Sequence, residues 1–102
     1  MPLVAGLDFG GGAIKACVAS VPEGEVLAVT QEPTETQHPA PGRAEFDPAA
    51  WWRAAGVAMR AAVAAAARPA VDYAAVSVSS LRQGYVLMDE AGELAPGVVN
   101  AD

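Results

Sequence analysis

One carboxylate and three consecutive glycines near the amino terminus have residue types and a spacing that could do chemistry. Asp8 is the only charge in the first apolar run, and Gly10, Gly11 and Gly12 follow almost directly. Glycines reach φ > 0 at little steric cost and leave their N–H groups open to an anion, which suits a phosphate. Lys15 is close enough to add a positive charge there, or else to lie solvated on the sheet edge. This pattern predicts a phosphate site.

A carboxylate inside an apolar strand needs a partner, because desolvating its charge is costly. For Asp8, a Mg²⁺ ion bound to nucleotide phosphates would be such a partner, and the alternative is a carboxylate that caps the turn. A dinucleotide-binding fingerprint is excluded because Lys15 stands where the third glycine should be, and the spacing does not match a P-loop. A glycine hairpin that binds nothing remains open.

A second set of polar residues follows a predicted strand at 73–80. Open sheets bind ligands beyond the carboxyl ends of parallel strands, so Arg82 and Gln83 are candidates for binding hydroxyl or phosphate groups. An ordinary exposed loop is the alternative. His38 lies in a proline-rich segment and is expected to be exposed to solvent, with no chemical role.

The elements that must position these residues follow from periodicity and turn chemistry. We expect strands 3–9, 13–21 and 26–30, an irregular loop 32–46, a helix 48–67, a strand 73–80, and an extended pair 84–88 and 93–99 around a turn at 89–92. The first three strands are expected to form an antiparallel meander, and the strand at 73–80 to lie parallel to the first. This order predicts an α/β fold.

The helix carries clear start and stop signals. Asp47 suits the N-cap and Pro48 the first helical position, and the helix should end before Pro69. A stripe of arginines marks its solvent face. The residues expected to face the sheet are Trp52, Gly56, Met59 and Val63, with Trp51 and Ala55 beside them.

Composition limits the classes of function. The 102 residues support one domain, and a net charge of −6 with six Lys and Arg argues against nucleic acid and anionic membrane surfaces as partners. One cysteine and one histidine make a zinc site improbable, and Cys17 is expected to be a small buried residue. The longest apolar run is far shorter than the roughly 20 residues of a membrane span. The basic flank of a signal peptide is missing, so we expect the protein to be located in the cytoplasm.

Four segments together resemble the FGGY carbohydrate kinases, a branch of the actin-like and sugar-kinase ATPase superfamily. They are Gly6–Ala16, Pro41–Pro48 with Trp51–Trp52, Val76–Asp89 and Asn100–Asp102. The resemblance implies a ribonuclease H-like (actin-like ATPase) fold, in which residues 1–102 are the incomplete N-terminal part of the first kinase domain. It also implies ATP-dependent phosphorylation of a carbohydrate or polyol hydroxyl. The nearest subgroup looks like the autoinducer-2 kinases, and xylulose is disfavoured as a substrate.

The resemblance implies roles for single residues as well. Asp8 would help to position Mg²⁺ and the transferring phosphate, with the glycine turn facing the phosphates of ATP. The residues implied to contact the sugar or polyol are Arg82, Gln83, Asn100 and Asp102. The family usually has hydroxyl side chains at positions 11–13, whereas this chain has none, so phosphate contacts there must come from backbone N–H groups. The general base is expected beyond Asp102.

Expectations about partners follow from this resemblance. The chain would need the remainder of the kinase chain, and alone it is expected to be inactive and to self-associate through exposed apolar strand faces. Two other classes stay open: a non-catalytic nucleotide-binding interaction module of the actin or chaperone type, and a structural domain whose glycine turn binds nothing.

Overall fold

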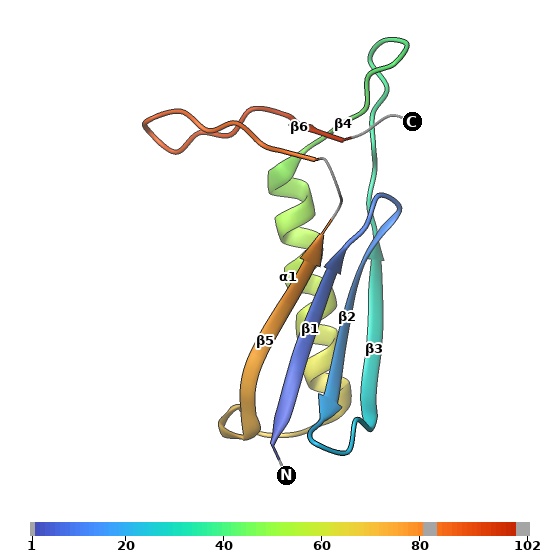
Figure 1. Ribbon diagram of the computed structural model, residues 1–102, viewed down its shortest axis with the longest axis vertical. Coiled ribbons are helices and arrows are strands. Elements are labelled where there is room, and N and C mark those ends of the chain that lie inside the picture. Colours follow the sequence, from blue (N-terminus) through green and yellow to red (C-terminus); the bar gives the residue numbers. More distant parts are fainter. Residues whose placement is uncertain (1, 81–83, 100–102) are drawn as a thin grey trace.

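A mixed four-stranded sheet with one helix against it forms the body of the molecule (Figure 1). This computed structural model describes residues 2–80 and 84–99. Strands β1 (Leu3–Phe9), β2 (Ala13–Ser20) and β3 (Val26–Pro33) form an antiparallel meander, and β5 (Tyr73–Ser80) pairs with β1 in parallel. The sheet order is β3-β2-β1-β5. The predicted α/β class, the meander and the parallel strand are confirmed.

Helix α1 (Pro48–Ala66) begins and ends close to where local chemistry predicts. The Asp47 carboxylate accepts hydrogen bonds from the N–H groups of Ala49 and Ala50, at 3.0 and 3.4 Å, as an N-cap should. Ala67 closes the helix in the left-handed conformation, with φ 55°. A 3-10 turn, η1 (Ala70–Asp72), then leads into β5. Within the described residues, no helix has the length and apolarity needed to cross a membrane.

The face of α1 that packs on the sheet differs from the predicted one. The buried residues are Trp51, Ala55, Ala58 and Ala62. Trp52 is 73% exposed, so its prediction as a core residue is wrong, while that of Trp51 is confirmed. Alanines occur on every face of this helix, so the hydrophobic periodicity of the sequence hardly distinguishes the buried face from the others. The small alanine side chains let the helix lie close to the sheet. This packing determines which face of the helix is buried.

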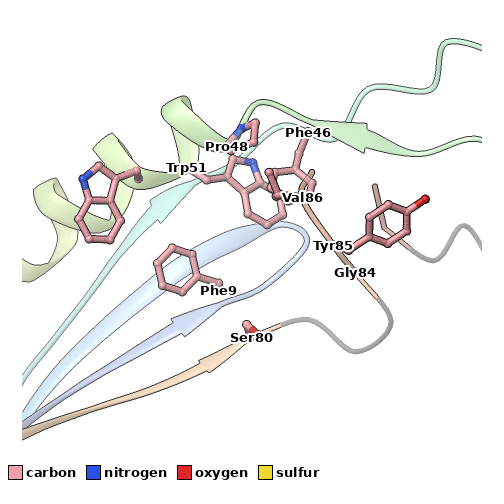
Figure 2. A pocket seen from close by; sticks show the side chains of 9 residues that line it. Phe9, Phe46, Pro48, Trp51, Ser80, Gly84, Tyr85 and Val86 are labelled. Atoms are coloured by element: carbon pink, nitrogen blue, oxygen red, sulfur yellow. The ribbon is translucent and has the colours of Figure 1, made fainter. Parts of the chain in front are cut away.

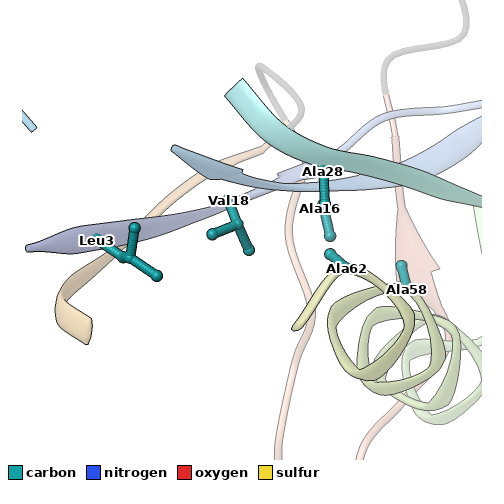
Figure 3. Packing of buried hydrophobic residues seen from close by; sticks show 6 residues of the cluster. All are labelled: Leu3, Ala16, Val18, Ala28, Ala58 and Ala62. Carbon is teal, nitrogen blue, oxygen red and sulfur yellow. The ribbon is translucent and has the colours of Figure 1, made fainter. Parts of the chain in front are cut away.

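Two apolar clusters form the core. The first joins Leu3, Ala16, Val18 and Ala28 of the meander to Ala58 and Ala62 of α1 (Figure 3). The second contains Ile14, Phe46, Trp51 and Ala55. The rings of Phe46 and Trp51 stack with centroids 4.0 Å apart, and the Trp51 indole N–H donates to the carbonyl oxygen of Glu35 at 3.3 Å. The second cluster thereby anchors the start of α1 beside the glycine turn.

The predicted irregular loop 32–46 is in fact partly paired. Its first two residues extend β3, Gln37 pairs with Glu45, and β4 (Glu45–Phe46) pairs with β6 (Gly97–Val98). A strand of two residues has no measurable periodicity, which is why the sequence pattern missed it. Gly97 is required there, because a Cβ would lie only 2.2 Å from the Phe46 ring.

Residues 84–96 form a long arm that projects from the body (Figure 1). Tyr85 pairs with Val98, Met88 pairs with Leu94, and the chain reverses at 89–92 with Gly92 at φ 85°. The predicted extended pair and its turn are confirmed, although most of the arm pairs through isolated bridges.

The helix leaves half of the sheet uncovered. It packs mainly against β2 and β3, so Val76 and Val78 of β5 are 62% and 59% exposed, although they lie beside the partly or fully buried Ala5 and Leu7 of β1. Parallel strands are normally buried on both faces. Among the described residues nothing pairs with the outer edge of β5.

Candidate phosphate and metal site

Asp8 lies near the carboxyl end of β1, on the sheet face opposite α1. Its register partners are Lys15 in β2 and Ser79 in β5, so the three side chains share that face. The Ser79 hydroxyl donates a hydrogen bond to Oδ1 of Asp8 at 2.8 Å. Asp8 is exposed, so the expectation of a buried carboxylate is wrong. Strand alternation turns this residue toward the face that α1 does not cover.

Asp8 and Lys15 take part in no ion pair among the described residues. The two residues are directly opposite across the β1–β2 ladder, yet they form no ion pair, and neither has another charged partner in the described part of the chain. Both side chains are exposed. A carboxylate and an ammonium group therefore lie side by side on this exposed face, with no ion pair to any described residue.

The glycine turn presents two open backbone donors. The N–H of Gly10 donates to the carbonyl oxygen of Ala13 at 3.0 Å and is not available to an anion, which corrects the expectation for this residue. Gly11 and Gly12 are exposed, and in the described structure their N–H groups make no backbone hydrogen bond. These two groups remain candidates for phosphate contacts.

The reason for glycine in this turn also differs from the prediction. Neither Gly10 nor Gly12 has a positive φ. A Cβ on Gly10 would lie 3.0 Å from the carbonyl oxygen of Ala13, whereas a Cβ on Gly12 would meet nothing within 4 Å. Close packing of the backbone accounts for Gly10, while the space beside Gly12 is open to an incoming group.

Thr34 and Thr36, in the loop that follows β3, donate hydrogen bonds to the carbonyl groups of the glycine turn. The Thr34 N–H donates to the carbonyl of Gly12 at 3.2 Å, and the Thr34 and Thr36 hydroxyls donate to the carbonyls of Gly10 and Gly11 at 3.5 and 3.2 Å. In a trans peptide the N–H points opposite to the preceding carbonyl. The N–H groups of Gly11 and Gly12 therefore point away from the threonines. No periodicity or motif in the sequence marks Thr34 and Thr36 for this role.

A groove of about 400 Å³ runs beside Asp8 on the open face of the sheet. Its lining includes Asp8, Lys15, Cys17, Ser77 and Ser79, together with the apolar Leu7 and Val29. Cys17 is half-buried here, rather than fully buried as expected, because nothing in the described structure covers this face. The described residues contain no group of three or more His, Cys, Asp or Glu that could hold a metal ion.

A second, apolar pocket of about 250 Å³ lies at the same end of the sheet (Figure 2). Phe9, Trp51 and Tyr85 are among its lining residues. It opens on the helix side of the sheet, since Phe9 and Asp8 are neighbours in one strand and point to opposite faces. None of Gly10, Gly11 and Gly12 lines it, so the pocket is separate from the glycine turn.

The predicted substrate residues Arg82, Gln83, Asn100 and Asp102 lie outside the described residues. Ser80 and Gly84, which flank Arg82 and Gln83 in the sequence, both line the apolar pocket. Among the predicted site residues, the structure brings together Asp8, the glycine turn and Lys15. Asp8 also contacts Ser79, which the sequence did not single out.

The βββαβ order of the main sheet and its helix, the sheet order β3-β2-β1-β5 and a carboxylate before a glycine turn together define a domain of the actin-like ATPase fold. Comparison with known proteins gives the family. The profile of the FGGY family of carbohydrate kinases, N-terminal domain, matches residues 3–100, and the chain belongs to this family. This family is one of carbohydrate kinases, not of interaction modules of the actin or chaperone type.

Autoinducer-2 kinases and xylulose kinases are among the proteins that this chain resembles. It is 40% identical over 100 residues to the autoinducer-2 kinase of Salmonella typhimurium (94% of this chain, 18% of the relative). It is 41% identical over 92 residues to the xylulose kinase of Streptomyces coelicolor (90% of this chain, 18% of the relative). The crystal structure of xylulose kinase from Rhodospirillum rubrum superposes with a TM-score of 0.83 at 31% identity, over 95% of this chain and 20% of that one. The predicted likeness to autoinducer-2 kinases is confirmed, and xylulose kinases are similarly close. The chain spans about a fifth of the length of these proteins.

Proposed function

We propose that this chain is the N-terminal part of a kinase that transfers a phosphoryl group from ATP to a hydroxyl of a sugar or polyol. One observation carries the proposal: an exposed carboxylate and two open backbone N–H groups stand together at the end of β1. Family membership supports it. Residues 1–102 then form an incomplete first domain, and the remainder of the kinase chain covers the open half of the sheet.

Asp8 suits a magnesium ion that is bound to a nucleotide. Mg²⁺ usually keeps several waters and takes one or two carboxylates together with substrate phosphates, rather than a cage made only of protein side chains. A single exposed Asp8, without further acidic neighbours able to form a metal cluster among the described residues, fits that mode. When bound, the ion supplies positive charge that offsets the charge of the phosphates.

The other groups have complementary roles in this proposal. The N–H groups of Gly11 and Gly12 bind phosphate oxygens, which replaces the hydroxyl side chains that most of the family has at positions 11–13. Lys15 adds a positive charge beside them as a point charge. The proposed contacts to the sugar or polyol hydroxyls are made by Arg82, Gln83, Asn100 and Asp102. The general base lies beyond Asp102, so the chain alone has no kinase activity.

Within the family we propose the autoinducer-2 kinase branch. Arg82 and Gln83, with Asn100 and Asp102, resemble that branch more than the xylulose kinases, which have a Met-His pair and Trp-Asn-Asp at these places. We place the reaction in the cytoplasm, where ATP is available.

A chimera tests the proposed function. The chain replaces the matching segment of the Salmonella typhimurium autoinducer-2 kinase, and product formation is measured with ATP, Mg²⁺ and a panel of autoinducer-2, xylulose and glycerol. We expect the chain alone to be inactive and the chimera to be active, and Asp8→Asn to lower chimera activity by at least about a hundredfold. A folded chimera without activity, or one that tolerates Asp8→Asn, would contradict the proposal. Preference for xylulose would overturn only the choice of branch.

A further inference from the structure

Asp8 has a possible partner on each side and contacts only one of them. Lys15 is its register partner in β2 and Ser79 its register partner in β5. The carboxylate accepts a hydrogen bond from the Ser79 hydroxyl at 2.8 Å and forms no ion pair with Lys15. The neutral neighbour holds the side chain, and the charged neighbour does not.

This choice matters for a metal-binding carboxylate. An ion pair with Lys15 would offset the negative charge that a cation needs, whereas a hydroxyl orients the carboxylate and leaves that charge in place. Oδ1 is occupied by Ser79, and Oδ2 has no hydrogen-bond partner in the described part of the chain. Groups that orient a metal-ligating carboxylate commonly matter for affinity nearly as much as the ligand does.

We propose that Ser79 is a positioning residue: its hydroxyl holds Asp8 so that Oδ2 faces the groove on the open face of the sheet, and it keeps Asp8 from pairing with Lys15. The inference rests on the proposed role of Asp8 in binding magnesium. The two residues are 71 positions apart and meet only because β5 pairs with β1 in parallel.

The first measurement needs no metal. Three-bond NMR couplings about χ1 of Asp8 are recorded in the isotopically labelled chain and in three variants. Ser79→Ala removes the donor, Ser79→Thr keeps it, and Ser77→Ala is the matched control. Ser77 lies on the same face of β5, and its hydroxyl makes no hydrogen bond in the described structure. We expect one χ1 rotamer in the wild type, Ser79→Thr and Ser77→Ala, and averaging over rotamers in Ser79→Ala. A fixed rotamer in Ser79→Ala would overturn the inference.

The second measurement asks whether this orientation matters to a metal. Mn²⁺ stands in for magnesium, and the paramagnetic broadening of Asp8 signals is followed during titration. We expect half-maximal broadening at about tenfold higher Mn²⁺ in Ser79→Ala, with recovery in Ser79→Thr. Equal weakening in Ser77→Ala would overturn the inference, since the effect would then belong to the strand as a whole. Wild-type chain without broadening at Asp8 would count against the proposed metal role, while the couplings would still decide whether Ser79 holds Asp8.

Discussion

At the scale of single residues, the three glycines of the turn have different roles, although they look alike in the sequence. Gly10 closes the turn through its own N–H and has the Ala13 carbonyl close by, whereas Gly12 borders open space. The N–H groups of Gly11 and Gly12 donate no backbone hydrogen bond to any described residue. The first glycine therefore serves the fold, and the later two are the proposed phosphate contacts.

A pair of matched substitutions separates these roles. Gly10→Ala places a Cβ 3.0 Å from a backbone oxygen that cannot move aside cheaply, so we expect the free energy of unfolding to fall by about 1 kcal/mol or more. Gly12→Ala meets nothing within 4 Å and should change stability by less than about 0.5 kcal/mol in either direction. Urea denaturation of both variants gives the comparison. Equal losses would show that the turn needs glycine for another reason.

Trp51 and Trp52 offer a second matched pair. Trp51 is 5% exposed, stacks on Phe46 and donates its indole N–H to Glu35, so Trp51→Ala should cost about 3 kcal/mol or more, or prevent folding. Trp52 is 73% exposed, and Trp52→Ala should cost less than about 1 kcal/mol. The midpoint of thermal unfolding, followed by circular dichroism, tests both. A larger loss for Trp52→Ala would contradict the observed face of the helix.

At the scale of elements, the start of α1 links the core to the candidate site. The Asp47 cap fixes the first turn of the helix, and this turn places Trp51 against Phe46, whose strand β4 pairs with β6. The threonines that support the glycine turn lie in the same connection between β3 and α1. A substitution that weakens the start of the helix should therefore also disturb the structure near the glycine turn.

The cap gives a graded prediction. Asp47→Ala leaves the N–H groups of Ala49 and Ala50 without their acceptor and should lower the free energy of unfolding by about 1 kcal/mol. Asp47→Asn keeps a side-chain oxygen and caps nearly as well, so it should lie close to the wild type. Both values come from urea titrations monitored by Trp fluorescence. If Asp47→Asn lost as much as Asp47→Ala, the negative charge rather than the hydrogen bonds would explain the effect.

At the scale of the whole molecule, the structure is one-sided. The helix covers β2 and β3, while β5 exposes valines on one face and an edge that pairs with no described residue and has no charge and no proline. Such an edge is prone to pair with another chain. We propose that the remainder of the kinase chain covers it, and that without this cover the chain associates with itself.

Self-association of the chain should respond to one charge on this surface. Val78→Lys adds a positive charge on β5, and we expect the average mass at high concentration to move toward that of a monomer. Val71→Lys is the matched control, because Val71 is 87% exposed but lies in η1, outside the sheet. Light scattering over a concentration series measures both. A monomeric wild-type chain, or an equal effect of Val71→Lys, would contradict the role assigned to β5.

The sequence by itself determined the order of the main elements, the capped helix and the glycine turn after Asp8, because these depend on local periodicity and on turn and cap chemistry. Only the tertiary structure decided which face of α1 is buried, since alanines on every face leave no hydrophobic pattern from which the buried face could be predicted. It alone put Asp8 on the open face, brought Ser79 to its carboxylate and set Thr34 and Thr36 against the turn. These contacts join residues far apart in the chain, and they exist only once strands pair in one register and the helix covers one side of the sheet.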